Sequence, residues 1–411
     1  MIKIEKKDGT IEPWNPKKIQ EAVLKSAARA NVTLNQLDLD KIIESVNQQL
    51  KLLPLSRNDQ QNIILSTKKL HPVVISILQT LYPQVAASYQ EYRDYKNTYA
   101  SEFEKIKHDA DGVLQLGDRE NANFDSSLIS TKGSLIKGYL TKSLYKQFYL
   151  SKTEKELTKR GDIYIHDLRD MILGSINCCL IDLSTILKDG FEMSNVQYNE
   201  PKSVLTALQL IGDITLITTA QQFGGFTIPE LDKTLLPYCI KTLRAAAHEY
   251  EEYSVEPKNV KEFKKAQKVY ALHKLRRELE QGFQSLELKL NTIPSARGDF
   301  AFTTITFGQW NPEDYTEDEK EILYYIGKTI LDTRKKGHGG KQVVFPKLVF
   351  LCDEEHIDSD PWNKKLFKDS VECSSQCMYP DYLSLTGNVK HNKVAQVYLE
   401  SGKKVITSPM G

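Results

Sequence analysis

The sequence predicts a protein of the α/β class, in which a small, mainly helical domain precedes a larger domain of helices and strands. Three observations lead to this prediction. A charged β-hairpin and four helical patterns fill residues 1–95. Residues 96–135 become rich in Asp, Gly, Asn and Ser toward their end and are predicted to form a connector. Over residues 136–411, long amphipathic segments alternate with short apolar runs, which is typical of an α/β domain.

The first domain is predicted to begin with a β-hairpin. Ile2 and Ile4 alternate with charged residues before Asp8-Gly9, a pair that favours a tight type I′ turn. Asn15 and Pro16 then suit the cap and first residue of a helix. Three further helices are expected. The first has its apolar face at Ile42–Leu50, and the second begins near residue 57 and contains Ile63–Leu65. The third contains Val85–Tyr92 and runs toward residue 107.

The second domain is predicted from the spacing of its apolar residues. Six segments show helical spacing, at residues 137–160, 203–222, 230–252, 259–290, 315–335 and 362–376. Apolar runs predict strands at Phe300–Phe307, at Val343–Cys352, and at Ala395–Leu399 together with Val405–Thr407. Strands that are separated by helices indicate an α/β arrangement.

Composition excludes several classes of protein. Of the 411 residues, 40% are hydrophobic and 27% are charged, so a disordered or fibrous chain is excluded. Lys and Arg number 55 against 54 Asp and Glu, a balance that gives no support for nucleic acid as a partner. The longest uncharged apolar stretch, Met171–Ile181, is shorter than the ~20 residues of a bilayer span. We therefore expect no membrane association and a cytoplasmic location.

The cysteines predict neither a disulfide scaffold nor a metal site. Six cysteines are too few for a disulfide-rich fold, and no pair of CxxC motifs indicates structural zinc. They are Cys178, Cys179, Cys239, Cys352, Cys373 and Cys377.

The Gly-rich run 337–341 does not match a phosphate-binding P-loop, and we interpret it as a connector between a helix and a strand.

The N-terminal hairpin carries the first candidate binding site. Lys6 and Lys7 precede its turn, and Lys18 lies near the start of the next helix, whose free amides favour anions. Glu12 could accept from an amine or a ribose hydroxyl. Together these residues could hold a nucleotide triphosphate. On spacing alone, however, a short basic turn is more often a solvated surface feature.

The complete pattern of this hairpin resembles the ATP-cone domain. It reads Ile4-x-Lys6-Lys7-Asp8-Gly9-(x)2-Glu12-(x)2-Asn15-(x)2-Lys18-Ile19, and Val85–Arg93 resembles the last helix of that domain. The resemblance implies that ATP or dATP binds as an allosteric effector. The residues that would contact the effector are Ile4, Lys6, Lys7, Glu12, Asn15 and Lys18. The domain usually has Lys-Arg before Asp-Gly, whereas this chain has two lysines, which lack the planar fork of arginine.

A second candidate site lies between Arg160 and Leu183. It contains His166 and, eleven residues later, Asn177-Cys178-Cys179. Taken alone, a cysteine pair in an apolar stretch is usually packed core, and such a histidine is usually structural. An ordered series of motifs, however, resembles the anaerobic, glycyl-radical (class III) ribonucleoside-triphosphate reductases. Besides residues 160–183, it comprises Arg119–Asn123, Pro201–Ser203, Phe223–Gly225, Phe283–Glu287, Val344–Phe350, Met378–Asp381 and Pro409–Gly411.

This resemblance implies a fold and a radical mechanism. The fold is a ten-stranded α/β barrel made of two five-stranded halves that run antiparallel to each other. A cysteine on a central loop becomes a thiyl radical and abstracts the ribose 3′-hydrogen, while a cysteine of the first strand takes part in loss of the 2′-hydroxyl as water. Formate is the usual reductant. An activase that uses an iron–sulfur cluster and S-adenosylmethionine places the stored radical on a glycine, near a four-cysteine zinc site.

Transferred to this chain, the resemblance assigns roles to four residues. Cys178 is the catalytic first-strand cysteine, and Asn177 before it binds substrate. His166 would orient substrate or formate. Lys202 would bind a phosphate of a dNTP specificity effector at the interface of a homodimer. Cys179, the next residue on the strand, should face the opposite side and pack in the core.

In the family, Pro-Met-Gly is followed at once by the thiyl cysteine, whereas this sequence stops at Gly411. We therefore expect the first part of the barrel, incomplete at the C-terminus and without the thiyl cysteine, zinc site and radical glycine. A split gene, an intein or truncation would explain this, and each predicts a chain that is inactive without a complementary C-terminal half. The alternative is a stand-alone ATP- or dATP-sensing regulatory protein that performs no catalysis.

Overall fold

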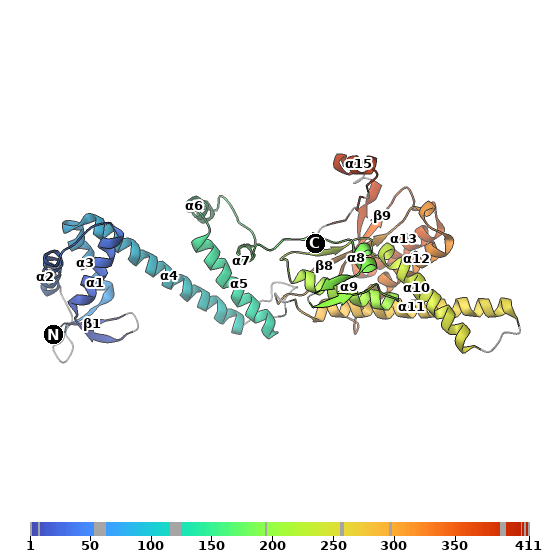
Figure 1. Ribbon diagram of the computed structural model, residues 1–411, viewed down its shortest axis with the longest axis horizontal. Coiled ribbons are helices and arrows are strands. Elements are labelled where there is room, and N and C mark those ends of the chain that lie inside the picture. The colour runs from blue at the N-terminus through green and yellow to red at the C-terminus, as the bar shows by residue number, and fades with distance from the viewer. Residues whose placement is uncertain are drawn as a thin grey trace. The chain divides into compact units, whose positions relative to one another are not determined.

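The computed structural model describes residues 2–6, 9–52, 63–115, 125, 127–193, 195–254, 259–295, 298–386, 392–403, 405–406 and 408–409. Lys7, the motif at 119–123 and Gly411 lie outside the described residues. The chain divides into two compact units, residues 1–108 and 109–411 (Figure 1). Within the described part, no helix is both long and apolar enough to cross a membrane.

The first unit is built on a three-stranded sheet. The predicted hairpin is present, with β1 (Ile2–Glu5) antiparallel to β2 (Ile11–Pro13). The helix expected over Ile63–Leu65 was a wrong prediction, because these residues form β3 (Ile63–Ser66), parallel to β1. Pairing with β1 completes the sheet and buries Leu65 completely. The helix that follows begins at Thr67.

Four helices pack on this sheet and one another. They are α1 (Pro16–Arg29), α2 (Gln36–Leu52), α3 (Thr67–Leu81) and α4 (Pro83–Gln115). Asn15 caps α1 as predicted, and its side chain accepts a hydrogen bond from the Lys17 amide over 3.0 Å. The apolar faces of α1 to α4 meet in one buried cluster that includes Val23, Val46 and Val74.

The second unit begins with helices rather than with the sheet. One helix was predicted over 137–160, but the chain forms α5 (Ile129–Phe148) and α6 (Lys152–Arg160), followed by α7 (Leu168–Met171). The break has a local cause, because the Ser151 side chain and Glu154 form a reciprocal capping box that starts a new helix.

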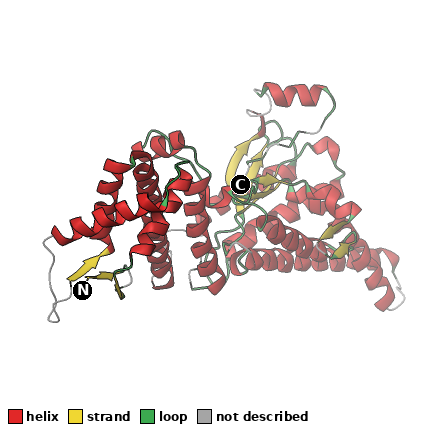
Figure 2. Cartoon of the chain, turned by 60° about the vertical axis from the view of Figure 1, so that its left-hand side comes forward, coloured by secondary structure: helices red, strands yellow, loops and turns green. Residues whose placement is uncertain are grey.

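A five-stranded parallel sheet forms the centre of the second unit (Figure 2). Its strands are β10 (Asp381–Ser384), β9 (Lys347–Cys352), β8 (Thr303–Gly308), β7 (Phe226–Ile228) and β4 (Cys179–Leu180), in that spatial order. All four pairings are parallel. A short helix, α8 (Leu183–Asp189), and a separate hairpin, β5 (Phe191–Met193) and β6 (Val196–Tyr198), follow β4.

Five long helices contribute to the core that packs on this sheet. They are α9 (Val204–Thr219), α10 (Leu231–Tyr253), α11 (Val260–Thr292), α12 (Glu317–Lys336) and α13 (Pro361–Cys377). All five lie within a few residues of the segments predicted from apolar spacing. Their buried side chains and alternate strand residues, such as Ile305 and Phe350, make up one core cluster.

The C-terminal part departs from the prediction. The strand expected at Ala395–Leu399 is instead α15 (Lys393–Glu400). Asn392 starts this helix by accepting hydrogen bonds from the amides of Val394 and Ala395. A strong cap therefore decided the structure of a segment whose alternating apolar residues favoured a strand. Val405 and Ile406 are described but are not part of a strand, and Thr407 lies outside the described residues.

Candidate functional site

Asn177 and Cys178 lie immediately before β4, beside the loop that leads into β7. The Gly224 amide donates to the Asn177 carbonyl over 2.6 Å, and the Cys179 amide donates to the Gly225 carbonyl over 3.1 Å. The Cys178 sulfur receives a hydrogen bond from the Gly225 amide at 3.3 Å and donates to the Asn177 amide oxygen at 3.3 Å. These contacts hold the thiol beside the starts of two adjacent parallel strands, β4 and β7.

Gly224 allows this close approach because it has no side chain. A Cβ at this position would lie 2.3 Å from the Asn177 Oδ1 and 2.5 Å from the Cys178 sulfur. Either separation is shorter than any ordinary contact, so another residue would displace the pair. The motif Phe223–Gly225 thus has a direct steric relation to Asn177-Cys178.

The two adjacent cysteines differ in environment. Cys179 packs against the main core, as predicted, and burial raises the pKa of its thiol to about 11, with a smaller contribution from Cys178. Its thiol therefore stays protonated at neutral pH and is a poor nucleophile. Cys178 is half-buried and lies outside that core cluster.

The face of the sheet that turns away from the helices carries threonines on β7 and β8, together with Val349 and Leu351 on β9. Phe226 and Ile228 of β7 belong to the helix-side core, so Thr227 between them faces the other side. Its hydroxyl donates to the Pro409 carbonyl over 2.9 Å. The segment Ser408–Pro409 therefore lies against the face of β7 that turns away from the core.

The other predicted residues of this unit, His166 and Lys202, form no hydrogen bond with Cys178 among the described residues. His166 is exposed, hydrogen-bonds Asp167 and has its ring 6.0 Å from that of Tyr164. No hydrogen bond joins it to Asn177 or Cys178 in the described part of the chain. Lys202 is exposed, two residues before α9.

In the first unit, the predicted lysines border a cationic cleft of about 980 Å³. The cleft lies between α1, α3 and α4, and Lys6 and Lys18 line one part of it. Most of its charged lining residues are basic: Lys6, Lys18, Lys25, Arg29, Lys68, Arg93 and Lys96. Such an excess of positive charge in a concave site attracts anions.

Glu12 organises the two lysines at this cleft. Its carboxylate accepts hydrogen bonds from Lys18, at 2.6 Å, and from Lys6. These bonds, the one from Lys18 first, hold the pKa of Glu12 below its usual value. Of the other predicted contact residues, Ile4 is buried in the core and Asn15 serves as the cap of α1, while Lys7 lies outside the described residues.

The far part of the cleft contains aromatic side chains that sequence reasoning did not single out for the site. The Arg29 guanidinium lies 4.3 Å from the centre of the Tyr92 ring, and the Lys96 ammonium lies 5.0 Å from it. Burial raises the pKa of Tyr89 to about 12, although Arg93 opposes the shift. The signal for these residues was their spacing on α4, where positions 89, 92, 93 and 96 share one face.

Metal-ligand geometry is not seen in the described ranges, where no group of three or more His, Cys, Asp or Glu side chains is placed to hold an ion. We derive no step that uses a metal bound to these residues.

Comparison with known proteins identifies the family of the second unit. The family model described as "Anaerobic ribonucleoside-triphosphate reductase" matches residues 120–410. The chain belongs to this family. A second model, the "ATP cone domain", matches residues 2–98, which include the cationic cleft apart from Ala100.

Several individual reductases are similar to this chain. The anaerobic ribonucleoside-triphosphate reductase of Salmonella typhimurium is 30% identical over 397 residues, which are 94% of this chain and 52% of that protein. The enzyme of enterobacteria phage T4 is 34% identical over 297 residues, covering 71% of this chain and 44% of its own. The chain spans about half the length of the curated relatives it matches. A crystal structure of the Thermotoga maritima reductase with dATP and CTP aligns over 71% of this chain and 49% of its own, with a TM-score of 0.45 and 17% identity.

Proposed function

We propose that this chain forms the N-terminal part of an anaerobic reductase that converts ribonucleoside triphosphates into deoxyribonucleoside triphosphates for DNA synthesis. The observation that carries the proposal is the hydrogen bond from the Gly225 amide to the Cys178 sulfur, which fixes a half-buried thiol at the edge of a parallel sheet. In this proposal the five-stranded sheet is the first half of a ten-stranded barrel, with domain limits at 1–95, 96–135 and 136–411.

The residues of this half act on the substrate. Cys178 faces the 2′ side of the ribose and takes part in loss of the 2′-hydroxyl as water. The Asn177 amide, which already accepts from that thiol, binds the substrate and orients the sulfur. His166 reaches substrate or formate from its exposed loop, and Lys202 binds a phosphate of the dNTP specificity effector at a homodimer interface.

The chain spans about half the length of its relatives, so in this proposal the remaining groups of the enzyme come from a second part. In this proposal the thiyl cysteine, the zinc cysteines and the radical glycine belong to a complementary C-terminal half, and an iron–sulfur activase that uses S-adenosylmethionine generates the radical. The contact of Thr227 with Pro409 supports this arrangement, because it directs the segment before the thiyl position onto the face next to Cys178. The assembled enzyme would be cytoplasmic, with formate as reductant.

The first unit regulates the enzyme by binding ATP or dATP. Lys6 and Lys18 hold phosphates of the effector, and the Glu12 carboxylate keeps both ammonium groups in place. The match to the ATP-cone and the basic lining of the cleft support this assignment.

Anaerobic complementation tests the catalytic proposal. The 411-residue chain is mixed with the C-terminal half of a related reductase, its activase and formate, and formation of dCTP from CTP is followed by chromatography. We expect product from the mixture, none from this chain alone, and none from the mixture with Cys178→Ser. Cys352→Ser is the control, because Cys352 is another half-buried strand cysteine. Product formation by the chain alone, or by the Cys178→Ser mixture, would contradict the proposal.

The alternative function is a stand-alone nucleotide sensor. It is favoured by one observation, that the cationic cleft lies wholly within residues 6–100 and uses no residue of the reductase unit. Binding of dATP to the chain, without turnover in any complementation mixture, would favour the sensor.

A further inference from the structure

A polar row crosses the sheet on the face that turns away from the helices. Thr227 on β7 pairs in register with Thr304 on β8, and Thr304 pairs with Lys347 on β9. Their sequence neighbours Phe226, Ile305 and Leu348 belong to the helix-side core, so alternation places all three polar residues on the opposite face. The row carries one ammonium and two hydroxyls, of which the Thr227 hydroxyl already donates to the Pro409 carbonyl, and it contains no carboxylate. Such a set of donors suits an oxyanion.

Thr304 is an unusual member of this row. Its side chain is 1% exposed, and its hydroxyl has no hydrogen-bond partner in the part of the chain that the structure describes. Buried polar groups in native proteins are nearly always hydrogen-bonded, and an exception calls for an explanation such as a ligand. The orphaned hydroxyl therefore points to a group that joins this face.

Lys347 is the charged residue of the row. Its side chain is half-buried, and its ammonium lies 4.5 Å from the centre of the Phe302 ring. Among the described residues, no carboxylate lies within ion-pair distance of it. A partly buried ammonium that lies against an aromatic face, with no carboxylate partner among the described residues, is ready to pair with an anion.

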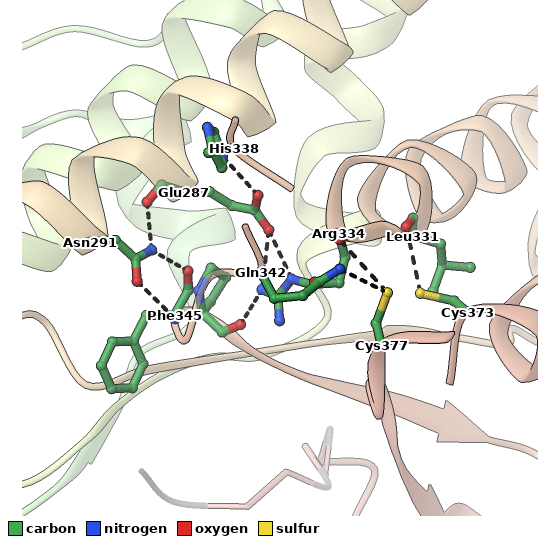
Figure 3. Close-up of polar contacts among 10 residues, drawn as sticks. Glu287, Asn291, Leu331, Arg334, His338, Gln342, Phe345, Cys373 and Cys377 are labelled. Atoms are coloured by element: carbon green, nitrogen blue, oxygen red, sulfur yellow. Dashed lines mark hydrogen bonds and ion pairs between the residues drawn. The ribbon is translucent and has the colours of Figure 1, made fainter. Parts of the chain in front are cut away.

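Side chains from two helices fix the backbone immediately before Lys347 (Figure 3). Asn291 of α11 accepts from the Phe345 amide at 3.1 Å and donates to its carbonyl at 2.6 Å. Arg334 of α12, which is completely buried, donates to the Pro346 carbonyl over 2.5 Å. Two long helices thus hold the start of β9 and determine where the Lys347 side chain leaves the sheet.

Glu287 completes this support. It pairs with Arg334 at 3.1 Å and with the His338 ring at 3.1 Å, and it is 4% exposed. Burying an ionic pair costs free energy. One use that can offset this cost is to hold a functional segment in place. Here these contacts hold the start of β9, and Lys347 is the charged residue that β9 places on the face away from the helices.

The row lies near Cys178 without touching it. Gly225, whose amide bonds the Cys178 sulfur, precedes Thr227 by two residues, or ~7 Å along the strand. Thr304 and Lys347 are one and two strands further, at ~5 Å per strand. A ribose carries its phosphates on C5′, several bonds from C2′, so a phosphate site belongs at a distance from the 2′-acting thiol.

We propose that Lys347 binds a phosphate of the substrate triphosphate on this face, and that the Thr304 hydroxyl becomes a second donor when the ammonium turns from Phe302 toward the ligand. This proposal rests on the reductase function proposed above. It makes Lys347 a substrate-binding residue, and Glu287, Asn291 and Arg334 its positioning residues.

Chemical footprinting tests the site without mutation or turnover. Acetylation of lysines in the 411-residue chain is followed by mass spectrometry, with CTP, inorganic tripolyphosphate or formate at equal ionic strength. Lys365 is the matched control, because its ammonium also lies 4.5 Å from an aromatic ring, that of Tyr324 on the helix side. We expect CTP and tripolyphosphate to slow acetylation of Lys347 but not of Lys365. Protection by formate alone, or equal protection of both lysines, would overturn the proposal.

Kinetics of the complemented enzyme provides the second test. Lys347→Met should raise KM for CTP about tenfold, the loss expected for one charge-assisted hydrogen bond, with a much smaller change in kcat. Lys347→Arg should recover much of this loss, and Lys365→Met should resemble the wild type. Thr304→Val, which keeps the side-chain shape, should raise KM in the same direction.

The two proposals fail in different ways. An active wild-type mixture with an unchanged KM in Lys347→Met would overturn the phosphate site and leave the reductase function standing. Inactivity of the wild-type mixture would count against the reductase function, while the footprint still decides whether Lys347 binds a triphosphate.

Discussion

The Gly225 amide donates a hydrogen bond to the Cys178 sulfur across 3.3 Å. This contact is possible because the preceding residue, Gly224, has no side chain. A Cβ on Gly224 would lie 2.5 Å from the same sulfur. The position of the thiol is therefore determined by two consecutive glycines on the neighbouring strand loop, and it can be disturbed without altering the cysteine itself.

Gly224→Ala should abolish turnover in the complemented enzyme and destabilise the chain by about 1–3 kcal/mol, because the methyl group must displace Asn177 and Cys178. Urea unfolding and dCTP formation measure the two effects. Gly133→Ala is the control, since a Cβ there meets no atom within 4 Å and should be neutral or slightly stabilising. Full activity of Gly224→Ala would show that Cys178 does not need its present position.

Lys18→Ala should weaken binding of ATP and dATP about tenfold, because it removes one charge-assisted contact to phosphate and releases Glu12 from its hydrogen bond with Lys18. Calorimetric titration of the full chain measures the affinity. Lys51→Ala, an exposed lysine at the end of α2, is the control and should leave the affinity unchanged. Equal losses in the two variants would indicate general electrostatic attraction instead of a defined site.

Much of the fold could be predicted where one face of a helix is apolar over many residues. Helices α9 to α13 were predicted in this way, because burial against a sheet requires a continuous apolar face. The secondary structure of short apolar segments was harder to predict. Ile63–Leu65 is an apolar run that suits a helix or a buried strand equally, and only its pairing with β1 decides between them.

The candidate site was predictable only in part, because most of it depends on register between distant strands. Asn177-Cys178 stood out through a resemblance. Thr304 and Lys347 were not singled out as site residues, because both lie inside apolar runs and meet only when β8 pairs with β9. Arg334 is one of three basic residues in the last turn of α12, a pattern typical of a solvent-exposed helix end, yet it is completely buried.

Glu287→Ala should destabilise the chain by about 3–5 kcal/mol, because it leaves the Arg334 charge buried without its partner. Glu280→Ala is a matched control, since the Glu280–Lys336 pair joins the same two helices at 2.8 Å but is more than half exposed. That variant should cost less than about 1 kcal/mol. Urea unfolding measures both losses. Similar losses of unfolding free energy in the two variants would show that breaking the buried pair costs no more than breaking the exposed one.

Asp232 should make stability depend on pH in an unusual direction. Its carboxyl is 1% exposed, and burial raises its pKa from 3.8 to about 6, even though the Gly308 amide donates to it over 3.0 Å. A carboxyl whose pKa is higher in the folded chain favours folding when it is protonated. Its contribution is therefore complete below about pH 4 and is lost as the pH rises through about 6.

Asp232→Asn removes this titration while keeping the shape of the side chain. Relative to this variant, the wild type should lose up to about 3 kcal/mol of unfolding free energy between pH 4 and pH 7, as a shift of about two pKa units requires. Urea unfolding at several pH values measures the difference, with Asp318→Asn, a largely exposed position, as the control. A difference between wild type and Asp232→Asn that stays constant over this range would mean that Asp232 is ionised throughout and is stabilised by the Gly308 amide and the neighbouring Lys233.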